Sequence, residues 1–132
     1  KNAQYAIGNF INDGMNKNFI KVKSKNLVYR SYLYSDDLVE WLIKIVISSK
    51  ISCPIYNVGS DKKIEIQKVA EIIGHFFNKP VKCMFKKRSK INEDKYIPNI
   101  NKTKDKLKLK INYNLKQSIY LTINHNNYEK KN

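Results

Sequence analysis

Residues 26–42 read NLVYRSYLYSDDLVEWL and join an aromatic, apolar run to the start of a helix. The alternation over 27–34 predicts a strand with one face made of Val28, Arg30, Tyr32 and Tyr34. Buried strands seldom carry an unpaired arginine, and no carboxylate stands at an obvious pairing distance on that face. We therefore expect Arg30 to pair with a ligand phosphate. The alternative is an ion pair with Glu40 or Asp36.

The second half of this stretch predicts a helix. Ser35 is the expected N-cap, and Asp36 and Asp37 in the first turn suit the positive end of the helix dipole. The residues that follow, LVEWLIKIVI at 38–47, are apolar nearly all round. Such a pattern is typical of a deeply buried helix.

The rest of the chain alternates between helical and strand-like patterns. Apolar spacing predicts helices over 3–15, 65–77 and 101–109, and a last helix that carries Leu115, Ile119 and Ile123. Short strands are predicted over 19–23, 55–58 and 81–85, with a turn at 24–26 and a polar, turn-rich segment over 86–101. This interleaving indicates one α/β domain over 1–123 and a frayed tail over 124–132.

Composition narrows the class of function. The chain has 132 residues, of which 42% are hydrophobic, and a formal net charge of +15 from 26 Lys and Arg against 11 Asp and Glu. Lysines on a solvated surface explain most of this positive excess. The more specific interpretation is that the positive charge attracts polyanions.

Cys53 and Cys83 lack a CxxC or Cys/His context, so we expect reduced core thiols, no metal and a cytoplasmic setting. No apolar run approaches the length that a membrane span requires.

Common catalytic and cofactor motifs are missing from the chain. Its four glycines, at 8, 14, 59 and 74, cannot form a GxGxxG fingerprint or a P-loop. No tyrosine has a lysine four residues later, and no Ser/His/Asp arrangement stands out. The residues therefore predict binding, with no catalytic and no cofactor-binding group in this chain.

Six pieces in a fixed order carry a resemblance to a known family: YAIGNFI, FIKVKSKN, YRSYLYSDDLVEWL, IYNVGS, IEIQKVAEII and DKYIPNINKTKDKL. Together they resemble the C-terminal, substrate-binding part of the NAD-dependent nucleotide-sugar epimerases and dehydratases, the extended short-chain dehydrogenases. The resemblance implies a small mixed α/β substrate-binding domain. The Rossmann half, which in the family holds NAD and the catalytic tyrosine, would be absent.

The resemblance also implies roles for particular residues. Arg30 matches the strand arginine that contacts the diphosphate, and Tyr32 falls where the family lines the nucleotide pocket. The resemblance also implies contacts from Lys21 and Lys23 on the strand beside the base. It implies contacts from Tyr5 and Ala6 at the first helix, and from Arg88 and Lys95 in the loop that closes over the phosphates. The implied ligand is a UDP- or dTDP-type sugar nucleotide, with NAD in the parent enzyme only.

Some positions depart from the family pattern. Ser24, Lys25 and Asn26 replace a glycine turn, and Lys108 replaces a glycine. Lys95 and Asn99 stand where an arginine and an aspartate are common. The turn can survive, since asparagine tolerates the left-handed conformation.

The resulting hypothesis is the sugar-nucleotide-binding portion of a 4,6-dehydratase (a lyase) or a 4-epimerase (an isomerase), with a slight preference for dehydratase-like enzymes of polysaccharide biosynthesis. As an isolated chain it would be inactive, and it would expose apolar surface that docks the Rossmann half or drives self-association. The chain does not begin with Met, which fits a fragment. The alternative is a small basic nucleic-acid-binding module, supported by the charge and the nine tyrosines.

Overall fold

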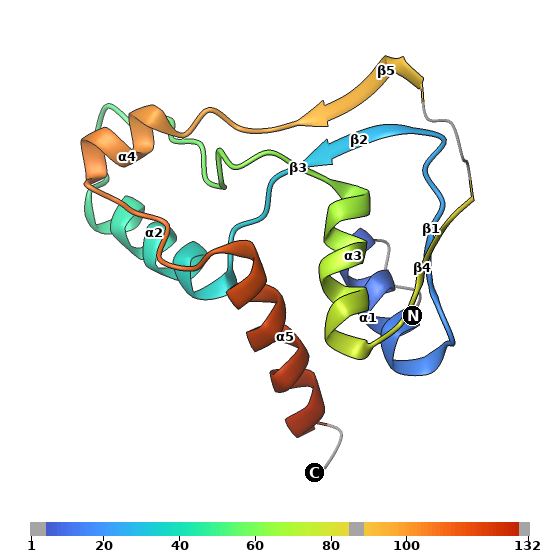
Figure 1. Ribbon diagram of the computed structural model, residues 1–132. Helices are drawn as coiled ribbons and strands as arrows, with labels where there is room; N and C mark the ends of the chain where they lie inside the picture. Colours follow the sequence, from blue (N-terminus) through green and yellow to red (C-terminus); the bar gives the residue numbers. More distant parts are fainter. Residues whose placement is uncertain (1–4, 85–88, 130–132) are drawn as a thin grey trace.

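The computed structural model describes residues 5–84 and 89–129, and it confirms the mixed α/β class (Figure 1). The elements in chain order are α1 (Ala6–Asn16), β1 (Ile20–Val22), β2 (Asn26–Arg30), α2 (Ser35–Ile47), β3 (Ile64–Glu65), α3 (Ile66–Phe77), β4 (Val81–Cys83), β5 (Ser89–Tyr96), α4 (Asn101–Leu107) and α5 (Leu115–Glu129). The predicted helices at 3–15, 65–77 and 101–109 correspond to α1, α3 and α4 within a few residues at their described ends.

The strands form two small sheets. Strands β1 and β4 pair in parallel, with Ile20 opposite Val81. In the second sheet β2 is central, antiparallel to β3 and parallel to β5, with Arg30 opposite both Ile64 and Tyr96. The pairing of β2 with β5 is irregular between Asn26 and Val28.

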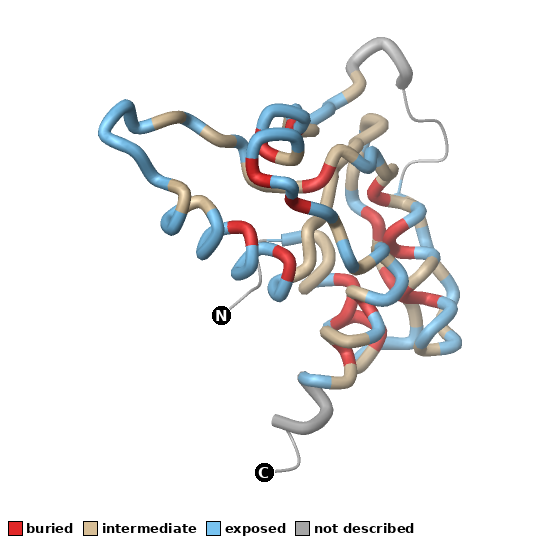
Figure 2. Tube along the Cα trace, turned by 90° about the vertical axis from the view of Figure 1, so that its left-hand side faces the viewer, coloured by how far each residue is buried: buried red, intermediate tan, exposed pale blue. Residues whose placement is uncertain are grey.

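Buried residues, red in Figure 2, form two clusters. The larger one packs α1 and α3 against β1 and α5, and its members include Phe10, Ile20, Val69, Ile73 and Ile123. The smaller one surrounds Trp41 of α2 with Ile100, Leu107 and Leu109. The Trp41 Nε1–H donates to the Lys110 carbonyl at 3.0 Å, so the buried indole keeps its hydrogen bond.

Helix α2 is not the deeply buried helix that its composition predicts. Among its residues only Asp37 and Trp41 are buried. Ile45 is half-buried against the Trp41 cluster, and the other large apolar side chains of α2 are exposed: Leu38, Val39, Leu42, Ile43, Val46 and Ile47. Hydrophobicity around a helix indicates that its faces need covering, but the described part of this chain covers only the Trp41 face.

The start of α2 also differs from expectation. Tyr34 occupies the N-cap position with an extended backbone and no side-chain cap bond, and Ser35 is the first helical residue. The strand predicted over 27–34 ends at Arg30, where β3 stops pairing with it. Residues 31–34 run on without a strand partner in the described chain.

The segment predicted as a strand over 55–58 has no strand pairing in the described structure. Instead, side chains of α4 donate hydrogen bonds to the carbonyl groups of this segment. Thr103 Oγ1 donates to the Asn57 carbonyl at 2.7 Å, and Lys102 Nζ donates to the Ile55 carbonyl at 2.8 Å. Conversely, the polar segment predicted as turns over 86–101 contains β5, which is held by pairing with β2.

The two cysteines and the C-terminal helix differ in part from the sequence-based expectations. Cys53 is exposed and not a core thiol, while Cys83 is half-buried. Helix α5 continues to Glu129, past residue 124 where the sequence predicts fraying. Across residues 5–84 and 89–129, no helix combines the length and the apolar character that crossing a membrane demands.

Candidate functional site

A cavity of about 790 Å³ lies between α1, β1 and β2. Its size is within the range typical of sites for small ligands and cofactors. It brings together most of the residues that the sequence singles out, namely Tyr5, Ala6, Lys21, Lys23, Arg30 and Tyr32. Their roles in binding stay a prediction, but their convergence on one cavity is a feature of the structure.

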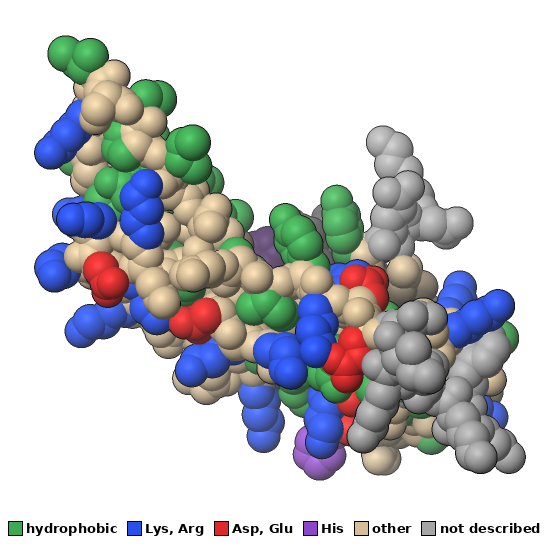
Figure 3. Space-filling model, turned by 90° about the horizontal axis from the view of Figure 1, so that it is seen from above, with side chains coloured by type: hydrophobic (Ala, Val, Ile, Leu, Met, Phe, Trp, Pro, Cys, Tyr) green, Lys and Arg blue, Asp and Glu red, His purple; other side chains and the backbone are tan. Residues whose placement is uncertain are grey.

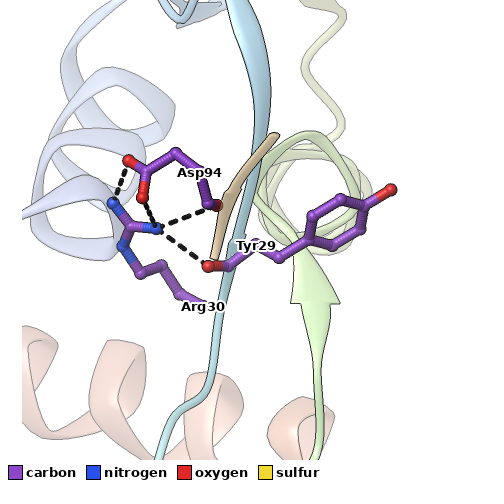
Figure 4. Close-up of polar contacts among 3 residues, drawn as sticks. All are labelled: Tyr29, Arg30 and Asp94. Atoms are coloured by element: carbon purple, nitrogen blue, oxygen red, sulfur yellow. Dashed lines mark hydrogen bonds and ion pairs between the residues drawn. The ribbon is translucent and has the colours of Figure 1, made fainter. Parts of the chain in front are cut away.

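The alternation predicted over 27–34 holds in part. Val28 and Arg30 of β2 and Tyr32 just after it line the cavity, whereas Tyr34 does not and Ser31, which the alternation places on the other face, does. The ring of Tyr29, between Val28 and Arg30, points to the opposite side of the strand (Figure 4). There it lies beneath the ammonium groups of Lys63 and Lys95, at 4.6 and 5.7 Å from the ring centroid.

Arg30 has a carboxylate partner, Asp94, where the sequence suggests none on that face. Its Nη2 donates to Asp94 Oδ2 at 2.6 Å, and its Nη1 donates to Asp94 Oδ1 at 3.0 Å. The chain thus supplies a carboxylate partner on β5, which is neither Glu40 nor Asp36, and phosphate binding by Arg30 stays a prediction. The premise of a buried arginine is also wrong, because about a third (32%) of its side chain is exposed.

The Arg30–Asp94 pair shifts both titrations in the expected directions. Its hydrogen bond to Asp94 raises the pKa of Arg30, and the same bond lowers the pKa of Asp94. Both groups are therefore charged at neutral pH. Because the Asp94 side chain is more than half exposed, water screens this pair.

Tyr32 lies deeper in the cavity wall than Arg30. It packs against the larger core cluster, and burial raises the pKa of its hydroxyl. The positive charge of Arg30 opposes that rise. Tyr32 thus presents a neutral phenol beside a cation, an arrangement suited to a ligand with both a ring and a charge.

The remaining charges at the cavity are mostly positive. Lys17, Lys21 and Lys23 line it together with Arg30, and Asp13 is the acidic member of the described lining. Asp13 is occupied locally: its Oδ1 lies 2.6 Å from Lys17 Nζ, and its Oδ2 accepts the Lys21 backbone N–H at 3.2 Å. It ties the end of α1 to β1 and leaves the cavity with a positive balance.

Of the two predicted loop residues, Lys95 does not line this cavity. Lys95 pairs with Glu93 and lies over Tyr29, on the other side of β2 from Arg30. That pairing raises the pKa of Lys95. Arg88 lies outside the described residues.

The structure also shows lining residues that sequence reasoning misses: Asn9, Phe10, Asn12, Asp13, Lys17, Ser24, Ser31 and Ile66. Asn9, Phe10, Asp13 and Lys17 follow helical spacing along and just beyond α1, so the face of that helix could have identified them. The Ser24 hydroxyl is buried, and no hydrogen-bond partner for it is found in the described chain. This serine belongs to the turn that replaces the family's glycine turn.

No catalytic constellation is found among the described lining residues, which include no His, Cys or Glu. Elsewhere in the described structure no three His, Cys, Asp or Glu side chains gather as a metal site would require. What the cavity offers chemically is a basic, partly aromatic concave surface. Such a surface suits an anionic ligand with a ring.

Comparisons with known proteins establish the fold. The sequence matches no protein-family model and no curated protein. Among solved structures, it superposes on the dTDP-glucose 4,6-dehydratase of Bacillus anthracis in complex with NAD, with a TM-score of 0.76 and 17% identity over 96% of this chain and 40% of that chain.

Other solved structures share this fold. The Bordetella bronchiseptica enzyme WbmF, in complex with NADH, gives a TM-score of 0.82 and 15% identity over 97% of this chain and 38% of that one. The UDP-glucose 4-epimerase of Thermotoga maritima with UDP-glucose gives 0.75 and 15% identity over 96% and 40%. The chain therefore has the fold of a part of the NAD-dependent sugar epimerases and dehydratases, as the sequence resemblance predicts. It spans about 40% of the length of the dehydratase and epimerase chains that it matches.

Proposed function

We propose that this chain is the sugar-nucleotide-binding part of an NAD-dependent nucleotide-sugar 4,6-dehydratase or 4-epimerase. The observation that carries the proposal is the cavity, where Arg30, Tyr32 and the lysines of β1 and its flank converge. It lies in a fold shared with a dTDP-glucose dehydratase and a UDP-glucose epimerase.

The chemistry of the cavity suits a nucleoside diphosphate. A diphosphate carries about two negative charges, and its oxygen pairs fit the fork of an arginine. Arg30 would bind it, and Lys21 and Lys23 would neutralise the remaining charge. Tyr32 and the exposed ring of Tyr5 would contact the base or the sugar. The ligand would be a UDP- or dTDP-type sugar nucleotide, and binding would take place in the cytoplasm.

Catalysis would need a part of the fold that this chain does not contain. In this proposal NAD and the catalytic tyrosine belong to that part, and the chain alone turns over no substrate. The part would dock on the exposed apolar face of α2, which we define as Leu38, Val39, Leu42, Ile43, Val46 and Ile47. At the left end of the molecule, where Figure 1 places α2 and α4, Figure 3 shows apolar side chains reaching the surface. Without its cover this face would promote self-association.

Isothermal titration calorimetry of the full chain with UDP-glucose and with dTDP-glucose tests the proposal. Binding of at least one ligand is expected, and Arg30→Ala should weaken it about 10- to 100-fold, the range for losing hydrogen bonds to a charged group. Lys68→Ala is the matched control, since it removes one positive charge from α3 outside the cavity lining. Equal losses in the two variants would contradict a specific role of Arg30.

A second measurement separates this proposal from nucleic-acid binding. A fluorescent single-stranded oligonucleotide is titrated at several salt concentrations, because phosphate-backbone binding falls steeply with salt. In Figure 3 the basic side chains are spread over the visible face and interspersed with acidic ones. Tighter binding of the oligonucleotide than of either sugar nucleotide at moderate salt would overturn the proposal. Turnover of a sugar nucleotide by the chain with added NAD would overturn the claim that it is inactive alone.

A further inference from the structure

Asp94 occupies the donor edge of Arg30 that an anionic ligand would use. We propose that Asp94 competes with the ligand's phosphate for Arg30, and that this competition sets the affinity of the cavity. The inference rests on the proposed function and adds Asp94 as a residue that weakens ligand binding.

The geometry of the pair imitates a bound phosphate. The two Asp94 carboxylate oxygens stand in for two phosphate oxygens, since each accepts from a different terminal nitrogen of the guanidinium, at 2.6 and 3.0 Å (Figure 4). The Asp94 carbonyl also accepts from Nη1 at 3.2 Å. While Asp94 is in place, its carboxylate fills the fork that suits a phosphate.

Release of Asp94 would cost little. Its side chain is 56% exposed, so the freed carboxylate would regain water at once. Exposed ion pairs contribute little to stability, because water and salt screen them. A ligand diphosphate carries more negative charge than one carboxylate, so it is favoured for the same donors in a cavity already lined by lysines.

Arg30 would stay in position after the exchange. Its Nη1 also donates to the carbonyl of Tyr29 at 2.8 Å, and that bond does not depend on the Asp94 side chain. Strand β5 would stay as well, because backbone pairing joins Val28 to Asp94, Tyr29 to Lys95 and Arg30 to Tyr96. The side-chain pair is therefore dispensable for the sheet and free to act as a displaceable anion.

The test measures the binding of inorganic pyrophosphate and of UDP to the full chain by calorimetry, for the wild type and for Asp94→Asn. The variant keeps the shape of the side chain and removes its charge, so affinity should rise about two- to fivefold, the range set by an exposed pair. The matched control is Asp61→Asn. Asp61 also forms a half-exposed ion pair, 3.0 Å from Lys104, but its partner Lys104, unlike Arg30, lies outside the cavity lining.

Each result has a defined meaning. A gain in Asp94→Asn that exceeds the gain in Asp61→Asn, and that is abolished in Arg30→Ala/Asp94→Asn, supports the inference. Equal gains in the two single variants would show only an effect of net charge and overturn it. Weaker binding by Asp94→Asn would overturn it too, since Asp94 would then position Arg30 for the ligand.

The failure of the inference differs from the failure of the proposed function. If the wild type binds and Asp94→Asn gains nothing, the inference falls and the proposed function stands. If only Asp94→Asn binds, the inference holds, but the natural chain does not carry the proposed function. If none of the proteins binds either probe, both are overturned.

Discussion

The carboxylate of Asp37 is buried in the first turn of α2, and it accepts hydrogen bonds from both the backbone and the side-chain nitrogen of Asn112. The distances to Oδ1 are 3.1 Å from the backbone nitrogen and 2.9 Å from Nδ2. The Tyr113 backbone N–H donates to Oδ2 at 3.2 Å. Asp37 thus joins the start of α2 to the segment that leads into α5, whereas the sequence suggests no more than a favourable interaction with the helix dipole.

This contact predicts that Asp37→Ala destabilises the fold strongly. The change would remove the acceptor of the partly buried backbone N–H groups of Asn112 and Tyr113, which costs about 1–3 kcal/mol of unfolding free energy. Urea unfolding of the variant measures that loss. The control is Asp36→Ala, one residue earlier and exposed, which should cost about 0.5 kcal/mol from the dipole alone. Similar losses in both variants would show that the Asn112 contact contributes nothing.

Local sequence patterns predict most of the helices and the strand face that carries the site. Helix α3 has a clear apolar face, and the predicted range 65–77 matches Ile66–Phe77 closely. The alternation of Val28, Arg30 and Tyr32 predicts that they share a face, and all three line the cavity. These features depend on residues a few positions apart, where periodicity is informative.

Features that depend on distant segments are missed. The partner of Arg30 lies 64 residues away on β5. Strand β5 itself is polar, and pairing with β2 holds it, so its sequence has no alternating apolar signal. The exposure of α2 is missed for the converse reason: an apolar helix predicts burial, but what covers it cannot be inferred from its own residues.

Lys108 predicts a stabilising substitution. It ends α4 in the left-handed conformation, with φ of 55°, at the position where the resembling family has a glycine. Because a side chain is disfavoured there, Lys108→Gly should raise the unfolding free energy by about 0.5–1 kcal/mol. The control is Lys106→Gly within α4, which should lower it by about 1 kcal/mol. Thermal unfolding compares the two, and destabilisation by both would contradict the assigned cap.

Tyr32 predicts a pH dependence at the alkaline end. Burial raises its folded-state pKa above the usual value near 10, so the unfolded chain loses this proton first as pH rises. Its contribution to stability is therefore fully present below about pH 10 and is lost as pH rises toward the folded-state pKa. Tyr32→Phe should lose less stability in that window than the wild type, as measured by urea unfolding at several pH values.

Arg30 should modulate the same titration. Its charge lowers the pKa of Tyr32, so Arg30→Ala should shift the Tyr32 titration to higher pH. Selective labelling of tyrosine ring carbons and NMR would follow it, with Tyr32→Phe identifying the signal. Lys68→Ala on α3 removes the same charge outside the cavity lining and should leave the titration in place. An unchanged Tyr32 signal in Arg30→Ala would show that the two groups do not interact.

The exposed face of α2 predicts self-association of the isolated chain. Ile43 and Val46 are 54% and 70% exposed, so replacing both with lysine should leave the unfolding free energy within about 0.5 kcal/mol of the wild type. The same change should lower the average mass at high concentration, measured by light scattering after size-exclusion chromatography, because it breaks an apolar patch. Two lysines placed instead at Ser49 and Ser52, both exposed just after α2, add equal charge without touching the face. If that pair disperses the chain as well, repulsion between charged molecules explains the effect. If the wild type is monomeric throughout, the α2 face does not drive association.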